Sequence, residues 1–323
     1  MCKVSIIVTA YNAEKLISNC LESCVNQTCL NTEIIVVDDG SVDKTSVVVT
    51  DFSNNDPRVR LISKKNEGLV EARKTGVSNA KGEFVFFIDA DDYIENNTIE
   101  ELLKYDDYDI IIGGIVIESN NGSTNYIQHT NRFKFDMTRC GIYANYLSKD
   151  ITASLCGRLI RKNLILGFDT PSEITIGEDV ITNFIILKSD DIKIKLVERQ
   201  FYHYVQYPTS MVNKKSNLRL DKRILYVNWI VNHLKCNNLL NNSLIMKTLP
   251  YFVMSEYYTY LRDGGSPDYN PTFYRDVILS FTDERVIKLL PFWQRMMINI
   301  FSYSSTAGRI YRFVFLKLRS LIK

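Results

Sequence analysis

The sequence predicts an α/β fold, in which a mostly parallel sheet is flanked by helices and followed by a helical C-terminal extension. Short apolar segments rich in β-branched residues alternate with amphipathic helical segments over residues 4–88. Segments such as Ile34–Val37 are apolar at every position, which is typical of strands that helices cover on both faces. From Leu218 onward the hydrophobic pattern becomes helical.

The first third of the chain is predicted to alternate between strands and helices. Its expected strands are 4–9, 33–38, 59–63 and 84–88. Its expected helices are 14–26, 45–54 and 69–79. Ligands of such sheets bind beyond the carboxyl ends of the strands, so we expect a functional site at that edge.

The rest of the chain is predicted to add a hairpin and several helices. A strand at 109–117, a turn at 120–123 and a segment at 126–129 together indicate the hairpin. The expected helices are 218–240, 244–261 and 273–281, with a break at 264–267. We place a domain boundary near Lys214, which divides the chain into a core domain at 1–214 and a helical region at 215–323.

Composition excludes several classes of protein. The 323 residues suffice for one large α/β domain with an extension, and the formal net charge of +2 is too small to favour nucleic-acid binding. The 7 cysteines contain no C-x-x-C pair, which predicts neither a disulfide framework nor a zinc site and fits a reducing cytoplasm. We expect no signal peptide, and no apolar run reaches the roughly 18 residues that span a bilayer.

Three carboxylates follow the strand expected at 84–88, in Asp89-Ala90-Asp91-Asp92. Two carboxylates about 4 Å apart repel by about 4 kcal/mol at an effective dielectric near 20, so such a cluster normally recruits a metal ion or a proton. Oxygen ligands without a nearby His or Cys favour Mg²⁺ or Mn²⁺ over Zn²⁺. The alternative is an acidic turn that caps the helix expected from Asn97.

Polar residues also follow the first two strands, at Thr9–Asn12 and Asp38–Ser41. Tyr11 offers a flat face for a nucleobase, while Thr9 can form hydrogen bonds with the base edge. Asp39 can accept the imide N–H of uracil, which cytosine lacks. The alternatives are that Tyr11 packs beneath the next helix and that the two acids form an Asx turn.

Arg73 lies about one turn into the helix that Asn66-Glu67-Gly68-Leu69 opens. On that helix it can face the same edge of the sheet and neutralise a diphosphate. The alternative is an ordinary solvated arginine on the helix surface.

These segments together resemble the inverting, GT-A-fold glycosyltransferases of family 2, which include many bacterial polysaccharide and cell-wall sugar transferases. The resemblance covers roughly the first 210 residues. It depends on five segments in this order: 4–12, 34–43, 66–73, 82–92 and Gly177-Glu178-Asp179. It implies a GT-A fold and makes residues 1–214 a catalytic domain.

The resemblance also implies a role for each residue of the donor site. Thr9, Tyr11 and Asp39 would hold the nucleotide base, and Arg73 would approach the phosphates. Asp89 would lie near the ribose. Asp91 would hold Mn²⁺ or Mg²⁺ against the diphosphate, where the metal stabilises the departing nucleoside diphosphate.

Inversion needs a base on the acceptor side, opposite the leaving group, that takes the proton of the acceptor hydroxyl. Asp179 is the candidate base, and Glu178 would orient it or bind acceptor hydroxyls. The alternative is an acidic first turn favoured by the dipole of the helix that follows.

The expected function is therefore metal-dependent transfer of a sugar from a nucleotide sugar, preferably a UDP-sugar, to a hydroxyl of a glycan or lipid-linked acceptor in surface polysaccharide synthesis. One alternative is a nucleotidyltransferase of the sugar-nucleotide pyrophosphorylase type, although its Gly-rich loop with Arg and a following Lys is missing. Another is a non-catalytic nucleotide-sugar-binding module, which would not need Asp179.

Two segments depart from the family pattern. Leu155–Ile160 resembles a segment usually written with Trp, Gly and Lys, but it lacks the aromatic residue and has Arg158 in place of Lys. Tyr202-His203-Tyr204 resembles the aromatic stretch before a loop over the donor, but Val205-Gln206 follows where relatives have Arg. For His203 a hydrogen-bonded structural role is favoured over a place in the metal shell.

The C-terminal region after Glu284 contains basic and aromatic residues but no acid. This combination suits contact with a bilayer surface, where each basic residue adds about 1 kcal/mol near anionic lipid. We therefore expect a cytoplasmic protein at the inner face of the cell membrane. The alternatives for this region are a surface helix packed on the core and a homodimer contact.

Overall fold

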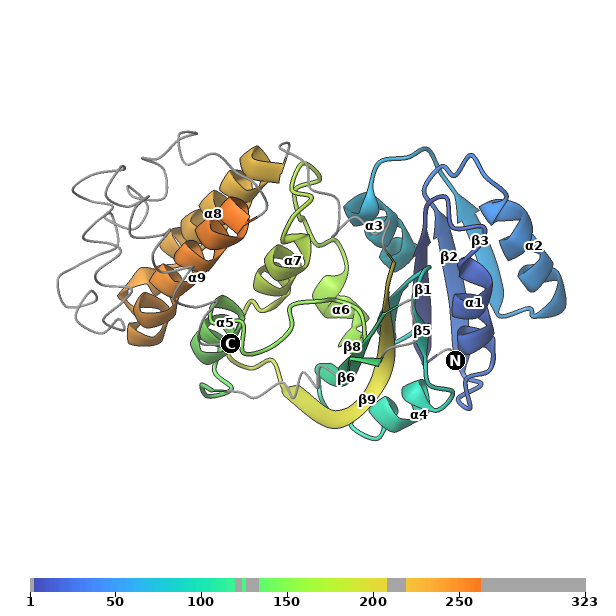
Figure 1. The fold of residues 1–323 in the computed structure, drawn as a ribbon. Coiled ribbons are helices and arrows are strands. Elements are labelled where there is room, and N and C mark those ends of the chain that lie inside the picture. The colour runs from blue at the N-terminus through green and yellow to red at the C-terminus, as the bar shows by residue number, and fades with distance from the viewer. Residues whose placement is uncertain (1–2, 120–123, 126–133, 208–218, 263–323) are drawn as a thin grey trace. The chain divides into compact units, whose positions relative to one another are not determined.

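The structure is a computed structural model that describes residues 3–119, 124–125, 134–207 and 219–262 (Figure 1). The chain divides into two compact units. One comprises Met1–Arg139 with Asp150–Lys214, and the other comprises Cys140–Lys149 with Lys215–Lys323. The catalytic role of residues 1–214 and the membrane or dimer role of 215–323 stay predictions.

The first unit is built on a nine-stranded sheet of order β3-β2-β1-β4-β8-β6-β9-β5, with β7 paired to β6. The first four strands are β1 Val4–Ala10, β2 Thr32–Asp38, β3 Val59–Ser63 and β4 Phe84–Asp89. The others are β5 Tyr93–Ile94, β6 Ile110–Ser119, β7 Thr124–Asn125, β8 Arg158–Arg161 and β9 Ile194–Gln206. The strands predicted in the first third and at 109–117 are all present, with ends that differ by at most a few residues.

Helices lie on both faces of the parallel part of the sheet. They are α1 Ile17–Val25, α2 Thr45–Asn55 and α3 Leu69–Asn79. In Figure 1, α1 and α2 lie on one side of strands β1–β3 and α3 lies on the other. This arrangement follows from right-handed crossovers, because β1, β2 and β3 succeed one another in one direction and β4 returns to the far side of β1.

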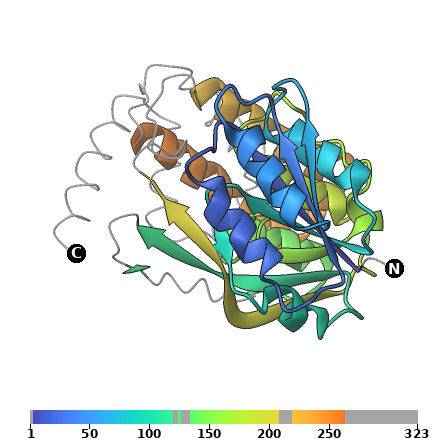
Figure 2. The same ribbon diagram turned by 90° about the vertical axis from the view of Figure 1, so that its right-hand side faces the viewer.

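Strands β3, β2, β1 and β4 pair in parallel, and all of β1 is buried. The predicted α/β fold is thus confirmed. Beyond β4 the sheet is mixed, because β8 pairs antiparallel with both β4 and β6, while β9 pairs parallel with β6 and antiparallel with β5. Figure 2 shows β6 and β9 running side by side across this part of the sheet.

Three further helices belong to the first unit, namely α4 Thr98–Leu103, α6 Lys162–Ile165 and α7 Glu178–Ile186. The predicted hairpin is described only in part. Its turn at 120–123 and the segment at 126–129 lie outside the described residues, whereas Thr124–Asn125 pairs antiparallel with β6.

The second unit is helical over its described residues, with α5 Arg139–Leu147, α8 Arg219–Cys236 and α9 Ser243–Arg262. The buried carboxylate of Glu256 on α9 accepts hydrogen bonds from Arg223 at 2.7 Å and Lys149 at 2.9 Å. Within the described residues, no helix combines the length and the apolar character that crossing a membrane requires. The helix predicted at 273–281 and the basic aromatic region after Glu284 lie outside the described residues.

Candidate active site

The carboxyl ends of β1, β2 and β4 meet at one edge of the sheet. Ala10 is in register with Asp38, and Thr9 with Asp89. The Thr9 hydroxyl donates to Asp89 Oδ1 at 3.1 Å. The loops after β1 and β2 are joined as well, because the backbone N–H of Asn12 donates to Ser41 Oγ at 2.9 Å. The structure therefore brings together the strand ends that the sequence singles out.

Arg73 is buried between two carboxylates, with 3% of its side chain exposed. Nη1 donates to Asp179 Oδ1 at 2.5 Å, while Nη2 donates to Asp89 Oδ1 at 3.3 Å and to Cys156 Sγ at 3.8 Å. Burial opposes the charge of Arg73, but the charges of Asp179 and Asp89 outweigh it and raise the pKa of Arg73 well above its usual value. Arg73 is thus a fixed cation that joins β4 to α7, and it does not lie on the helix surface.

Asp179 lies in the first turn of α7, directly after Gly177 and Glu178. Gly177 has φ of 75°, a left-handed conformation that glycine adopts without steric cost, and this turns the chain into the helix. Asp179 Oδ2 accepts a hydrogen bond from the backbone N–H of Leu155 at 3.2 Å. The carboxylate is therefore held from two sides, by Arg73 and by Leu155.

Glu178 has a raised pKa, which predicts a pH dependence of stability. Burial, and then the charge of Asp179, raise the pKa of Glu178 from 4.5 to about 7. Between those values the folded protein binds more protons than the unfolded chain, so its free energy of unfolding falls as pH rises from 4.5 to about 7.

Glu178→Gln is expected to flatten this part of the pH profile of stability. Urea unfolding at several pH values measures it, with Glu22→Gln on the exposed side of α1 as the control. Part of the slope will remain, because burial and neighbouring carboxylates also raise the pKa values of Asp91 and Asp92. A Glu178→Gln profile that coincides with the profile of the Glu22→Gln control would contradict the expectation.

The two later acids of the tetrad have different surroundings. Asp92 is 1% exposed, and its carboxyl group accepts from the Tyr202 hydroxyl at 2.5 Å and from the Val205 N–H at 2.9 Å. Burial, and then Asp89 and Asp91, raise the pKa of Asp92 to about 9. Asp92 therefore anchors the tetrad to β9. The Tyr202 oxygen also accepts from the backbone N–H of Asp89 at 3.2 Å.

Asp91 is the acid that remains for a cation. Burial, and then the charge of Asp89, raise the pKa of Asp91 to about 6. A carboxylate in that position gains from a bound cation, and its oxygen atoms are ligands of the kind that Mg²⁺ and Mn²⁺ prefer. Within the described residues, no group of three or more His, Cys, Asp or Glu side chains is arranged to hold a metal ion.

Asp39 and Tyr11 lie beside the end of β1. Asp39 is 4% exposed and organises the loop that leads into α3, because Oδ1 accepts from Lys64 Nζ at 3.0 Å and Oδ2 accepts from the Gly68 N–H at 2.7 Å. Tyr11 is 54% exposed, so it does not pack beneath the following helix. The Asx turn is present at Asp38, whose Oδ1 accepts from the Ser41 N–H at 3.0 Å.

His203 lies on β9 and is held by its neighbours. Its ring nitrogens lie 2.8 Å from Glu118 Oε1 and 2.9 Å from Glu95 Oε1, and the ring stacks on Tyr93 with centroids 4.3 Å apart. The structural role favoured from the sequence agrees with this geometry. Cys156 and Tyr202 also contact this cluster, through Arg73 and Asp92, and no local sequence pattern predicts these contacts.

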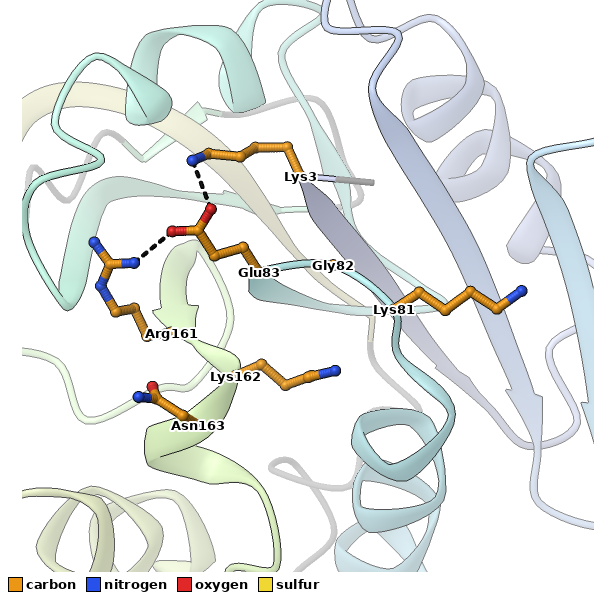
Figure 3. Close-up of a pocket in the computed structure, with 7 residues that line it drawn as sticks. All are labelled: Lys3, Lys81, Gly82, Glu83, Arg161, Lys162 and Asn163. Atoms are coloured by element: carbon orange, nitrogen blue, oxygen red, sulfur yellow. Dashed lines mark hydrogen bonds and ion pairs between the residues drawn. The ribbon is translucent and has the colours of Figure 1, made fainter. Parts of the chain in front are cut away.

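A separate pocket lies at the opposite edge of the sheet, where β1 and β4 begin (Figure 3). It is lined by Lys3, Lys81, Gly82, Glu83, Arg161, Lys162 and Asn163. Glu83 pairs with Lys3 at 2.7 Å and with Arg161 at 2.5 Å, and it is the one carboxylate among the residues that line the pocket. This pocket contains none of the residues predicted to form the site.

A family model matches the part of the chain that contains the ends of β1, β2 and β4. The model of glycosyl transferase family 2 matches residues 5–165, which include Thr9, Tyr11, Asp39, Arg73, Asp89 and Asp91. Residues 5–165 belong to glycosyl transferase family 2. The family 2 segment ends before Glu178 and Asp179, so the match does not extend to the candidate base.

Several curated relatives are named as glycosyltransferases. The putative glycosyltransferase EpsH of Bacillus subtilis is 31% identical over 221 residues, which are 65% of this chain and 63% of EpsH. The cholesterol galactosyltransferase of Borreliella burgdorferi is 30% identical over 234 residues, 68% of this chain and 64% of the relative. The glycosyltransferase GlyA of Streptococcus pneumoniae is 43% identical over 102 residues, 32% of this chain and 15% of GlyA. The chain thus spans less than two thirds of the length of each of these relatives.

Solved structures of Staphylococcus aureus TarS 1-349 share the fold. The complex with UDP-GlcNAc has a TM-score of 0.69 at 21% identity, covering 96% of this chain and 91% of TarS 1-349. The complex with UDP has a TM-score of 0.68 at 23% identity, with the same coverage. These likenesses confirm the GT-A fold that the family resemblance implies.

Proposed function

We propose that the protein is a metal-dependent inverting glycosyltransferase that moves a sugar from a UDP-sugar to a hydroxyl of a glycan or lipid-linked acceptor in surface polysaccharide synthesis. The observation that carries the proposal is the convergence of Asp89, Arg73 and Asp179 at the carboxyl edge of the sheet. Membership of family 2 supports the reaction class. The TarS complexes with UDP and UDP-GlcNAc support a UDP-sugar donor.

The donor would lie across the ends of β1, β2 and β4. Tyr11 is exposed and can stack on the base, while the Thr9 hydroxyl and the Asp39 carboxylate lie at the same edge of the sheet and can form hydrogen bonds with the base. Both oxygens of Asp39 already accept hydrogen bonds, and the second lone pair of Oδ2 can accept the imide N–H of uracil. Asp89 would approach the ribose.

Asp91 would hold Mg²⁺ or Mn²⁺ together with oxygen atoms of the donor diphosphate. When bound, the metal ion would supply positive charge that stabilises the departing nucleoside diphosphate. The neighbouring acid Asp92 is unsuited to this task, because its carboxyl group is committed to Tyr202 and Val205.

Asp179 would act as the base. Its carboxylate takes the proton of the acceptor hydroxyl as that oxygen bonds to the anomeric carbon, and the bond from that carbon to the diphosphate oxygen breaks on the opposite face. Arg73 and the Leu155 N–H fix the position of the carboxylate before the acceptor arrives. Glu178, on the same helical turn, would orient the base or bind acceptor hydroxyls.

An assay of UDP release with a panel of UDP-sugars, with Mn²⁺ and with EDTA, tests the proposal. Release of UDP that depends on the metal is expected. A binding module would release none. A nucleotidyltransferase of the pyrophosphorylase type would instead form UTP when pyrophosphate is added, and either result would contradict the proposal.

Asp91→Ala and Asp39→Ala are expected to separate metal binding from base recognition. A ligand that binds only the folded state raises the melting temperature, so a thermal-shift screen of nucleotide sugars with and without Mn²⁺ reports both. Asp91→Ala should abolish the Mn²⁺-dependent part of the shift. Asp39→Ala should weaken the response to UDP without changing metal affinity, each variant being compared with its own unliganded protein. Equal losses in both variants would contradict this division of roles.

The place of the protein in the cell is also a proposal. We expect it in the cytoplasm at the inner face of the membrane, where a lipid-linked acceptor would be within reach. Contact with the membrane through the basic aromatic C-terminal region, and homodimer formation, stay proposals as well, because that region lies outside the described residues.

A further inference from the structure

Arg158 is a buried charged side chain that contacts the helix carrying the candidate base, and 0% of its surface is exposed. Nη1 donates to Asn183 Oδ1 at 3.0 Å, and Nη2 donates to the backbone carbonyl of Thr152 at 2.9 Å. Burying a cation costs several kcal/mol unless hydrogen bonds compensate it, so Arg158 depends on these two contacts to remain buried. Arg158 belongs to the segment in which the sequence departs from the family pattern.

Asn183 connects Arg158 to the helix that carries Asp179. It is 0% exposed and lies four residues after Asp179 on α7, so both residues lie on one side of the helix. Asn183 Nδ2 donates to the backbone carbonyl of Asp179 at 2.7 Å and to that of Ala153, also at 2.7 Å. Its amide therefore joins the first turn of α7 to the segment 152–155.

The segment 152–155 then returns to the base itself, because the Leu155 N–H donates to Asp179 Oδ2 at 3.2 Å. After a turn at Gly157, Arg158 donates back to the Thr152 carbonyl of this segment. Gly157 has φ of 74°, and a Cβ atom there would lie 3.1 Å from Tyr202 Cβ. These hydrogen bonds form a closed network. Arg158 contacts Asn183, and Asn183 contacts Asp179. Asp179 contacts Leu155, whose segment 152–155 is bonded to Arg158.

We infer that Arg158 and Asn183 are positioning residues for the base Asp179, an inference that rests on the proposed function. They touch neither donor nor acceptor in this role. They fix the first turn of α7 against the segment 152–155, which keeps the Leu155 N–H within hydrogen-bond distance of the Asp179 carboxylate. A base must come within about 2.6–3.2 Å of the proton it takes, and a misplacement of about 1 Å can cost about 100-fold in rate.

Two variants test this inference, one at Arg158 and one at Asn183. Arg158→Lys keeps the charge, but one ammonium group cannot replace the two-pronged guanidinium on Asn183 and Thr152. Asn183→Asp keeps the oxygen that accepts from Arg158 and loses the N–H groups that bind Asp179 and Ala153. In UDP release from the preferred UDP-sugar, kcat is expected to fall about 10- to 100-fold in each variant, with the KM for the donor within about threefold of the unmodified protein.

The decisive measurement repeats both substitutions in an Asp179→Asn background. A positioning role requires that kcat falls no further there, because residues that act as a unit are non-additive. A merely structural role predicts the same fold loss in both backgrounds. Ser5→Ala is the matched control, since Ser5 is 0% exposed and hydrogen-bonded to Glu33 at the opposite edge of the sheet. It should lower stability and leave kcat unchanged when all proteins are assayed well below their melting temperatures.

The possible failures are distinguishable. Unchanged kcat in Arg158→Lys and Asn183→Asp, or equal losses with and without Asp179, would overturn the positioning role and leave the proposed function standing. Absence of UDP release from the unmodified protein with every donor would overturn both. If one variant does not fold, the other still decides, because each breaks the network at a different bond.

Discussion

Asp179→Asn is expected to lower the rate of sugar transfer by about 10²- to 10⁴-fold, the usual contribution of a general base. The amide has nearly the shape of the carboxylate but cannot take a proton from the acceptor hydroxyl. It can accept from Arg73 or from the Leu155 N–H, but not from both in the way the carboxylate does. Affinity for the UDP-sugar should change by less than about threefold, because the proposed base contacts the acceptor and not the donor.

Rates of UDP release with donor and acceptor, together with donor binding by calorimetry, measure both quantities. Asp107→Asn is the matched control, since Asp107 is exposed on the loop that follows α4. If Asp179→Asn retained more than about a tenth of the rate, the base would be another residue. A loss of donor affinity as large as the loss of rate would place Asp179 at the donor instead.

Arg73→Met is expected to lower the free energy of unfolding by about 3–5 kcal/mol, as is usual when one partner of a buried ion pair is removed. The guanidinium contacts Asp179 and Asp89 at once, so its loss leaves two carboxylates close together without their cation. Arg73→Lys should cost less, because it keeps a charge but can contact only one carboxylate well.

Urea unfolding at pH 7 tests this expectation against Arg60→Met. Arg60 on β3 is 39% exposed and pairs with Glu33 at 3.4 Å, and a pair of that kind contributes about 0–1 kcal/mol. If Arg73→Met cost no more than Arg60→Met, the carboxylates would have another source of compensation. The assignment of Arg73 as their fixed cation would then be wrong.

The elements of the parallel half were predictable because their signals are local. In fully apolar strands and in amphipathic helices, the spacing of apolar residues along the sequence shows which residues are buried. In addition, the carboxyl ends of parallel strands lie at the same edge of the sheet. The meeting of Thr9 with Asp89 follows from that rule alone. In the mixed half of the sheet β6 was predicted, but β5 and β8 were not, because their 2 and 4 residues are too few to show an alternating pattern.

The different roles of the neighbouring acids were harder to predict from the sequence. Asp91 and Asp92 are neighbours of one type, and only the packing of Tyr202 and Val205 from β9 separates a buried anchor from a candidate ligand. Arg73 and Asp179 are 106 residues apart, so nothing in either local segment indicates that they form an ion pair. The partner of a long polar side chain depends on tertiary packing, which periodicity does not encode.

The bond between Arg73 and Asp179 also bears on how such enzymes diversify. The family 2 segment ends at residue 165, whereas Asp179 and β9 follow it. A chimaera joined at that point would take the buried Arg73 from one parent and its partner Asp179 from the other. Recombination between homologues should therefore succeed where the crossover leaves Arg73 and Asp179 in a segment from the same parent.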